Sequence, residues 1–411
     1  MSKETAKSPW RLESYRSWFV ADTATGIGAQ FRNLALPLLV LFVSGSLAQA
    51  GLMTTATTLI RVALSPIGGV LLDRMDRRTA MYVYAAVSTV VWAAVTAVIV
   101  TGDVTVVHLW VASVITAVNG ALLGAASDVA LLSIAQGGTY AKAMASNQGR
   151  DAFLGLVAPP VGGALYGLTR WSPFLASAIF SLIMLPAAKL IRADLKPPTA
   201  ERRSLLTELI EGFAYAWSTA ERRVLMVMVM FVNVMAAFLL GGVSFYLMDI
   251  GTSAFLIGVA DAVAGAAMLL GALVAPKVMD RLRPGPAIVG GLLWFAAAFV
   301  ITAVYPHYWG LVVGQALAAL PLTLVNSLVG GYYFATVRLA MQGRVHSVLG
   351  VASGGLSALP PALLGFLLPA YGYRTTAVVA IAAIVLGALA FGATRTSRTI
   401  PRVSEWPSPE A

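Results

Sequence analysis

Long runs of apolar residues, separated by short polar segments, occupy most of the chain between residues 17 and 394. Each run has about 20 residues or more, the length that a helix rising 1.5 Å per residue needs to cross a bilayer core of about 30 Å. The pattern predicts an all-α integral membrane protein with twelve spanning helices. The predicted spans are 17–43, 47–72, 79–101, 104–128, 141–168, 172–191, 223–249, 253–276, 286–305, 308–335, 346–369 and 374–394.

The composition agrees with a membrane protein. Of the 411 residues, 58% are hydrophobic and 11% are charged, and the mean hydropathy is +0.81. Soluble domains carry about 25% charged residues. The first apolar run follows Arg16, is too long for a signal-peptide core and lacks a small-residue cleavage site, so no removable signal peptide is expected. Cysteine is absent, which excludes disulfides and thiolate–metal chemistry.

The net charge of +10 follows the predicted topology. With the N-terminus inside, 23 of the 28 Lys and Arg residues fall in cytoplasmic segments, while Arg170 and Arg374 fall outside and Arg32, Arg61 and Arg150 lie within spans. This asymmetry is the positive-inside rule and predicts that both termini are cytoplasmic. The basic balance therefore reflects membrane topology, and nucleic acid is not expected as a partner. The excess of arginine over lysine is compatible with a GC-rich bacterial genome and hence with a bacterial inner membrane.

The spans divide into two halves joined by a polar segment. We expect an N-terminal six-helix half at 1–191, a cytoplasmic linker at 192–222, a C-terminal six-helix half at 223–394 and a disordered tail at 395–411. The linker is interpreted either as a plain connection or as an amphipathic helix on the inner membrane surface. The second interpretation rests on apolar residues at helical spacing, namely Leu205, Leu206, Leu209, Ile210, Phe213 and Trp217.

One charged loop occurs in both halves. In the first half it lies between spans two and three, and Asp73-Arg74 has a copy 207 residues later as Asp280-Arg281. A duplicated membrane protein with matching charged loops is most simply a transporter. We expect these loops to form a cytoplasmic gate. Its predicted residues are Gly69, Asp73, Arg74, Arg77, Arg78, Asp128, Asp280 and Arg281, with Asp128 paired to Arg77 or Arg78 and Asp73 facing the start of span eleven.

A proline-rich segment also recurs. Span five contains Pro159-Pro160 followed by Gly162-Gly163, and span eleven contains Pro360-Pro361, 201 residues after the first pair. Prolines inside a helix remove backbone donors and bend it, and glycines let a neighbouring helix approach closely. Generic membrane-helix Pro and Gly are the alternative explanation. The recurrence at equivalent places favours a duplicated transporter.

These motifs resemble the major facilitator superfamily. The stretch from Gly69 to Arg78 is similar to the family signature G-x-L-x-D-R-x-G-R-R, with Asp76 in place of its second glycine. The span-five segment resembles the antiporter motif G-x-x-x-G-P-x-x-G-G, with Leu154 and Ala158 at its first two glycines. Gly343-Arg344-Val345 and the linker resemble the branch of macrolide-efflux and enterobactin-exporter proteins. The resemblance implies the major facilitator fold and favours export.

The first span has a polar face. On a 100° helical wheel the polar residues of this span fall within one arc and apolar residues fall opposite, so the polar arc is expected to face a water-filled cavity. Charges in a span are costly and therefore usually paired or functional. Asp22 is the first candidate for a proton site and Asp151 the second, against a purely structural pairing. The predicted cavity residues in the first half are Gln30, Arg32, Asn33 and Arg150, with Arg32 facing either an anionic substrate or a helix carboxylate.

The second half offers amides in place of charges. Gln315 and Asn326 are eleven residues apart in span ten and share a helix face, as do Asn233 and Ser244 in span seven. These residues could line the same cavity. Asp261 in span eight is a weaker candidate for coupling.

Other chemistry has little support in the sequence. His108, His307 and His346 are far apart, so neither a metal site nor a cofactor is expected. No GKS or GKT phosphate loop occurs, so ATP is not the expected energy source. A membrane enzyme, a channel and a non-transporting receptor are the other classes. The favoured prediction is a monomeric, proton-coupled exporter of small amphipathic compounds such as drugs, natural products or siderophores. The alternative is a proton symporter or a facilitator that imports a small solute.

Overall fold

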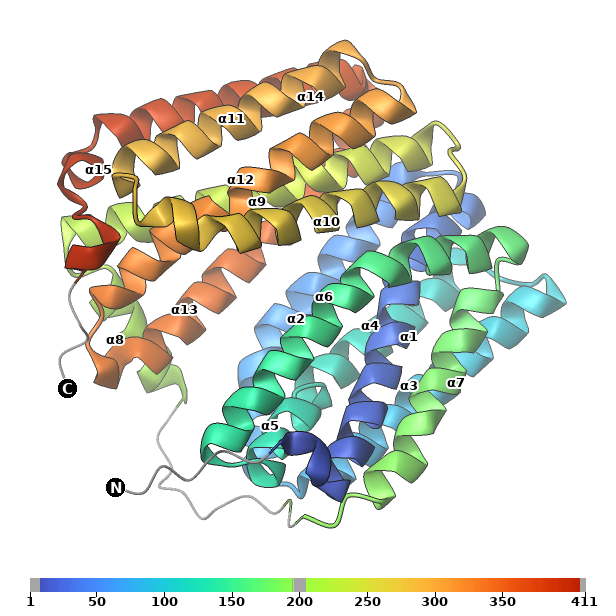
Figure 1. Cartoon of the computed structure of the whole chain (residues 1–411). Helices are drawn as coiled ribbons and strands as arrows, with labels where there is room; N and C mark the ends of the chain where they lie inside the picture. Colours follow the sequence, from blue (N-terminus) through green and yellow to red (C-terminus); the bar gives the residue numbers. More distant parts are fainter. Residues whose placement is uncertain (1–7, 194, 196–204, 407–411) are drawn as a thin grey trace. The chain divides into compact units, whose positions relative to one another are not determined.

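The fold is helical throughout the part of the chain that the structure describes. The computed structural model describes residues 8–193, 195 and 205–406, which contain α-helices and 3-10 turns and no strand (Figure 1). Within these residues, eleven helical stretches are long and apolar enough to cross a membrane. The last stretch, Met341–Ala393, contains two successive spans, because Gly372 has a φ of 72° that no continuous helix allows. The predicted all-α membrane fold is confirmed.

The chain forms two compact units. The first contains Met1–Glu201 with Thr252–Val259, and the second contains Arg202–Gly251 with Ala260–Ala411. The helices of the first unit are η1 Pro9–Arg11, α1 Glu13–Ser44, α2 Leu47–Leu72, α3 Arg77–Thr101, α4 Val106–Leu123, α5 Ala126–Ile134, α6 Gly137–Leu168 and α7 Ser172–Lys189.

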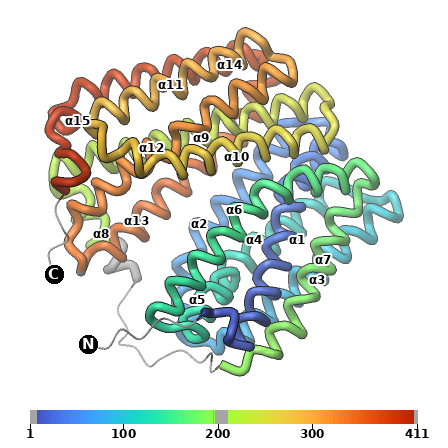
Figure 2. The backbone as a smooth tube through the Cα atoms, viewed as in Figure 1, coloured from blue at the N-terminus to red at the C-terminus, as the bar shows by residue number. Residues whose placement is uncertain are grey.

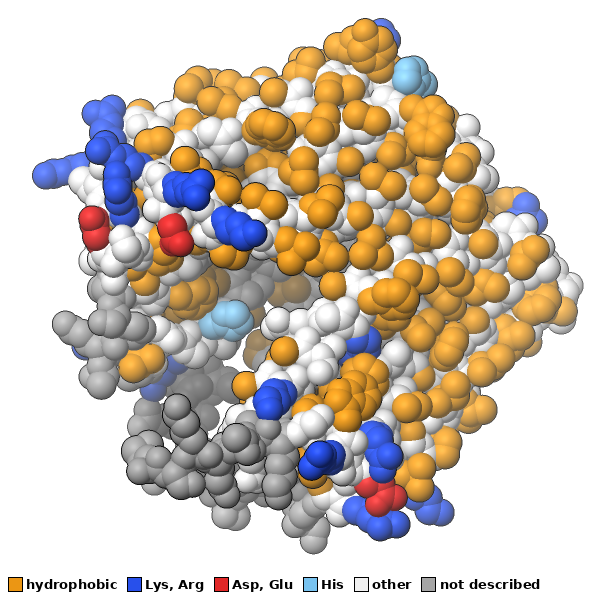
Figure 3. All heavy atoms as spheres, viewed as in Figure 1, with side chains coloured by type: hydrophobic (Ala, Val, Ile, Leu, Met, Phe, Trp, Pro, Cys, Tyr) orange, Lys and Arg blue, Asp and Glu red, His pale blue; other side chains and the backbone are white. Residues whose placement is uncertain are grey.

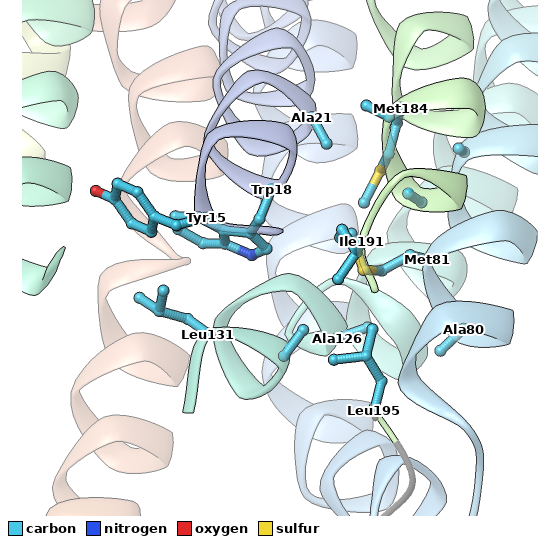
Figure 4. Packing of buried hydrophobic residues seen from close by; sticks show 14 of the residues in the cluster. Tyr15, Trp18, Ala21, Ala80, Met81, Ala126, Leu131, Met184, Ile191 and Leu195 are labelled. Carbon is cyan, nitrogen blue, oxygen red and sulfur yellow. The ribbon is translucent and has the colours of Figure 1, made fainter. Parts of the chain in front are cut away.

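In the first unit, α1 packs on both α6 and α7, while α3 packs on α7 and α4, and α2 packs on α4. One end of the bundle is filled by a core in which Trp18 of α1 lies with Met81 of α3, Leu131 of α5 and Met184 of α7 (Figure 4). Trp18 is fully buried, and its indole N–H donates to the Ser127 carbonyl oxygen at 2.8 Å. This core fixes the end of α1 that carries Asp22.

Close helix contacts in the first unit depend on glycine. A Cβ on Gly68 of α2 would overlap the backbone of Ala121 and Leu122 in α4. A Cβ on Gly28 of α1 would come within 3.2 Å of the Ser177 Cα in α7. Membrane helices have no hydrophobic force to bring them together, so small residues that let backbones approach contribute much of their packing.

The second unit contains the remaining helices. They are α8 Leu205–Ala216, α9 Ala220–Asp249, α10 Ala254–Met279, α11 Pro284–Val304, α12 Tyr308–Ala335, α13 Leu339–Ser357, α14 Pro360–Ala393, α15 Arg395–Thr399 and η2 Val403–Glu405, the first part of α10 clustering with the first unit.

The helix contacts of the first unit recur in the second. The α9 helix packs on α13 and α14 as α1 packs on α6 and α7, and α11 packs on α12 and α14 as α3 packs on α4 and α7. Gly271 of α10 lies against the Leu320 backbone of α12, as Gly68 of α2 lies against α4. This repetition is the pseudo-symmetry that the sequence predicts.

The predicted span eleven is interrupted within the membrane. The α13 helix ends at Ser357, and α14 begins at Pro360, with Ala358 and Leu359 between them. Ala358 and Leu359 keep helical φ and ψ angles, so the backbone continues through this junction. Only the helical hydrogen-bond pattern is interrupted before Pro360-Pro361, as expected of prolines that lack a backbone N–H. In contrast, α6 continues through Pro159 and Pro160.

The tail prediction is wrong for residues 395–406, while residues 407–411 lie outside the described part. Thr394 accepts a hydrogen bond from the Ser397 N–H and caps α15, which packs on α11 beside Gly285 (Figure 2). The Trp406 ring lies at a tilt of 53° to the Tyr332 ring, with the ring centroids 5.6 Å apart. These contacts hold part of the segment 395–406 against α11 and α12, and they could not be inferred from its proline-rich composition.

The predicted linker helix is present as α8 and packs along α13 of its own unit. Gly212 lies against the Arg344 backbone, and the Arg344 guanidinium pairs with Glu211 at 2.6 Å. Burial raises the pKa of Tyr215, but hydrogen bonds from Arg338 and the charges of Arg222 and Arg338 outweigh it, so the pKa is lowered overall. Residues 196–204, which connect the helix to the first unit, lie outside the described part.

Apolar side chains cover much of the molecular face seen in Figure 3, and Lys and Arg gather mainly in one group at the upper left and another at the lower right of this view. Large side chains such as Leu168, Trp309 and Leu386 are more than half exposed. In water such a surface would aggregate, whereas lipid tails cover it at no cost.

Candidate transport site in the first unit

An ion pair joins α1 to α6. The Arg150 Nη2 lies 2.7 Å from the Asp22 Oδ2, and the side chains of Arg150 and Asp22 are only 10% and 15% exposed. From the sequence, Asp22 is either a proton site or one partner of a structural ion pair. In the structure it forms an ion pair with Arg150. A pair removed from water in this way needs further hydrogen bonds to offset the cost of desolvation.

Those further hydrogen bonds come from α5 and α6. The Ser127 hydroxyl donates to Asp22 Oδ1 at 2.5 Å, while Arg150 donates through Nε and Nη2 to Asp151 Oδ1 at 3.0 and 2.8 Å. The Arg150 guanidinium also lies 5.2 Å from the centre of the Phe19 ring. One arginine therefore joins two carboxylates of very different exposure, since the Asp151 side chain is 62% exposed.

Asp128 belongs to the same charged cluster. It lies close enough to feel the charges of Asp22, Asp151 and Arg150. The predicted ion pair of Asp128 with Arg77 or Arg78 is wrong: among the described residues, neither arginine pairs with it. Asp128 is exposed in the first turn of α5, whereas Arg77 donates to Ser133 and Arg78 donates to carbonyl oxygens after α7. We name Asp22, Asp128, Arg150 and Asp151 the acidic cluster.

The predicted cavity residues of α1 lie in different surroundings. Arg32 is partly buried, donates to the Ser177 hydroxyl of α7 and lies 5.0 Å from the centre of the Trp92 ring. Arg32 and Asn33 line a cavity of about 170 Å³ between α1, α2, α3 and α4. Gln30 is partly buried and is not among the residues that line it.

The amide side chains of the second unit that were predicted to line the cavity have different surroundings. Gln315 is 1% exposed and its Nε2 donates to the Ala260 carbonyl at 2.9 Å, so it holds α12 to α10. Asn326, predicted to share its face, is exposed. Asn233 donates to the Val229 carbonyl of its own helix. Asp261 of α10 accepts a hydrogen bond of 2.7 Å from Ser244.

The segment between α2 and the start of α3 contains both exposed and buried charged residues. Asp73 and Arg74 are exposed, whereas Arg77 is 7% exposed and donates to the Ser133 hydroxyl at 2.6 Å. Arg78 donates to the carbonyl oxygens of Ile191 and Ala193 after α7. Arg77 and Arg78 thus bind the loop to α5 and to the end of α7.

Asp76 explains the departure from the family signature. Its carboxylate accepts the Arg78 N–H at 2.7 Å and caps α3, with an ordinary φ of −58° that requires no glycine. No described atom lies within 4 Å of a Cβ on Gly69, so the tight contact belongs to its neighbour Gly68. In the second unit, Asp280 and Arg281 are exposed after the end of α10.

The glycines of the span-five motif lie at helix contacts. A Cβ on Gly162 would come within 3.3 Å of the Phe31 backbone in α1, so this glycine sets the distance between α1 and α6. A Cβ on Gly163 would overlap the Ala254 backbone. These contacts explain why the motif keeps small residues here.

Comparison with known proteins identifies the family. Residues 19–250, more than half of the chain, match the Major Facilitator Superfamily. The chain belongs to this superfamily. No curated protein sequence matches it. As a member of the family it is a multi-pass membrane transporter and not an enzyme.

Solved structures of transporters share the fold. The nucleoside transporter NupG matches at 12% identity with a TM-score of 0.72, covering 92% of this chain and 98% of that protein. A bacterial homologue of the iron transporter ferroportin matches at 13% with a TM-score of 0.71, covering 94% and 100%. A bacterial homologue of the human lysosomal transporter Spinster matches at 17% with a TM-score of 0.69, covering 97% and 98%. Identities this low show the fold alone.

Proposed function

We propose that this major facilitator protein is a proton-coupled exporter of small amphipathic compounds that works by alternating access. The observation that supports the proposal most directly is the acidic cluster. It joins two carboxylates, Asp22 and Asp151, to the Arg150 guanidinium, with Asp128 near enough for its charge to interact with theirs, in helices long and apolar enough to span a membrane. Fully ionised, the four groups would carry an excess of negative charge, which a bilayer strongly disfavours. Binding of a proton would reduce that excess.

The geometry also suggests how a proton changes the contacts. Arg150 binds buried Asp22 and exposed Asp151 at the same time. If Asp22 takes a proton, its attraction for Arg150 falls and Asp151 becomes the stronger partner. The link between α1 and α6 would then weaken, because Asp22 belongs to α1 and both other residues belong to α6. A proton can shift a conformational equilibrium only through such a difference in contacts.

Export is proposed from the sequence motifs. Pro159, Gly162 and Gly163 resemble the span-five motif of antiporters, and the resemblance to macrolide-efflux and enterobactin exporters points the same way. The sorting of Lys and Arg supports a bacterial inner membrane with both termini in the cytoplasm. The exposed loop residues Asp73, Arg74, Asp280 and Arg281 are proposed to act in the cytoplasmic gate.

The test is transport by the purified protein in proteoliposomes with an imposed pH gradient. The compounds are a panel of fluorescent amphipathic drugs and ferric siderophores. We expect movement of at least one compound against the direction of proton flow, and loss of that movement when an ionophore collapses the gradient. Substrate counterflow without a gradient separates a carrier from a channel, a receptor or an enzyme. Movement with the proton flow would replace export by symport, and counterflow that ignores the gradient would identify a facilitator.

A further inference from the structure

The cavity between α1, α2, α3 and α4 has an unusual lining. Its 14 residues include two arginines, Arg32 and Arg61, and no carboxylate. Asp22 lies ten residues before Arg32, which is about 15 Å along a helix and out of reach of a direct contact. The two guanidiniums are close enough for Arg32 to feel the charge of Arg61. Two like charges within membrane-spanning helices repel each other and are costly unless an anion lies near them.

The hydrogen-bond donors of the cavity are also incompletely used. Arg32 donates to Ser177, and the Tyr84 side chain lines the same cavity. The phenol hydroxyl of Tyr84 can both donate and accept a hydrogen bond. Trp92 is 2% exposed, yet its buried indole N–H has no partner among the described residues. A buried donor of this kind normally meets an acceptor.

The threonines of the cavity do not supply donors. Thr54, Thr57 and Thr116 donate their hydroxyl protons to carbonyl oxygens of their own helices at 2.8–2.9 Å. The donors that remain for a ligand are therefore on Arg32, Asn33, Arg61, Tyr84 and Trp92. A planar guanidinium matches the oxygen pair of a carboxylate or phosphate.

The size of the cavity limits what enters it. Its volume of about 170 Å³ is below the range of about 300–1,000 Å³ that holds a whole drug-sized ligand. The cavity suits one charged head group with a short attached segment. The remainder of such a ligand would extend beyond the lining residues.

We propose that this cavity is an oxyanion subsite, in which Arg32 and Arg61 bind the carboxylate or phosphate group of an organic substrate. The inference rests on the proposed function only in treating the ligand as the transported compound. It defines the substrate class as amphipathic organic anions. Trp92 and Tyr84 would supply both aromatic surface and donors to the bound group.

The experiment is isothermal titration calorimetry on the purified full chain in detergent. The probes are benzoate and phenyl phosphate, with benzamide and benzylamine as neutral and cationic counterparts of similar size. We expect the two anions to bind and the counterparts to bind at least about tenfold more weakly. Arg61→Gln should weaken the anions by on the order of 10- to 100-fold, because one charged hydrogen-bond donor is lost.

Arg61 is the residue to change first because it is exposed, whereas Arg32 makes structural contacts whose loss can prevent folding. Arg61→Lys should restore part of the affinity, since the charge returns without the planar fork. Arg374→Gln is the matched control, because Arg374 lies in α14 of the second unit and donates to the Val304 carbonyl. Its anion binding should equal that of the wild type.

Two results would overturn the subsite: equal binding of benzoate and benzamide, or unchanged anion binding in Arg61→Gln. These results are separate from the proposed function. Wild-type protein that transports under a pH gradient but binds neither anion would remove the subsite and leave proton-coupled transport intact. Anion binding without any gradient-driven transport would support the subsite and contradict proton-coupled transport.

Discussion

The contact between α1 and α6 in the first unit contains Asp22, Arg150 and Asp151, whereas no ion pair joins the equivalent helices of the second unit, α9 and α13, among the described residues. In that unit the buried Gln315 holds α12 to α10, and the one acidic residue inside α10, Asp261, meets the Ser244 hydroxyl. The shared helix contacts show that packing does not require the charges. The charges of the first unit therefore call for a functional explanation, and coupling to protons is the one that we propose.

The largest expected effect comes from Arg150→Met. This change leaves Asp22 as a buried charge without its partner, and removal of one partner from a buried pair costs about 3–5 kcal/mol. The measurement is the free energy of unfolding in detergent. The double change of Asp22→Asn with Arg150→Met should recover most of the loss, because no unpaired charge remains.

The matched change in the second unit is Gln315→Leu. The Ala260 carbonyl keeps its place in a helix and Leu has a similar size, so the expected loss is about 1.5 kcal/mol or less. A loss as large as that of Arg150→Met would show that the two units do not differ in the way described.

Equal effects are expected where the two units use the same packing. Gly68→Val and Gly271→Val each push a side chain into a helix backbone across the contact, and we expect each to lower the unfolding free energy by about 1–3 kcal/mol. Gly69→Val is the control: a Cβ at Gly69 meets open space, and valine has a slightly higher helix propensity than glycine, so stability should stay the same or rise slightly. Thermal unfolding of the three variants measures the comparison. A loss confined to one unit would argue against the shared packing.

Sequence alone predicted the spans well, because about 20 apolar residues in succession have few other folds available. It predicted a distortion at Pro360-Pro361 but not the interruption at Gly124–Ala125, since hydropathy does not depend on the local hydrogen-bond pattern. It also set the start of span seven at residue 223, whereas Thr219 caps the helix and α9 begins at Ala220. A polar cap adds residues to a helix without changing the apolar run.

The sequence indicated the charged residues of the candidate site but not the serine hydroxyl groups that contact them. Asp22 and Arg150 stand out because charges in a span are rare. Ser127 and Ser177 do not, because a serine in a membrane helix usually bonds to its own backbone, and only the register between helices brings it to a charge. The close contact of Gly68 with α4 was not predicted for a related reason: consecutive residues point about 100° apart, and sequence does not show which one faces the neighbouring helix.

A moderate effect is expected at the proposed gate. Asp73→Asn should shift the balance between the conformations of the carrier by on the order of 1–2 kcal/mol, about the value of one hydrogen bond. Transport should fall about five- to thirty-fold while membrane insertion stays normal. The chain has no cysteine, so single cysteines on the cavity walls report the shift through their labelling rates. Labelling identical to that of the parent would remove Asp73 from the gate.

The smallest effect is expected at the junction of α8 with α13. Glu211 is about half exposed, so Glu211→Gln should lower stability by only about 0.2–1 kcal/mol, and less at high salt. Unfolding measured at low and high salt tests this expectation. A loss above 2 kcal/mol would give α8 a larger role in holding the second unit together.

The most direct test of the coupling role of the acidic cluster is the transport behaviour of Asp22→Asn in proteoliposomes. Asparagine keeps the shape and a hydrogen bond to Arg150 or Ser127 but cannot exchange a proton near neutral pH. The account predicts that substrate counterflow remains within about threefold of the wild type, while transport driven by a pH gradient falls at least about a hundredfold, a difference of about 2.8 kcal/mol. Wild-type response to the gradient in this variant would contradict the account.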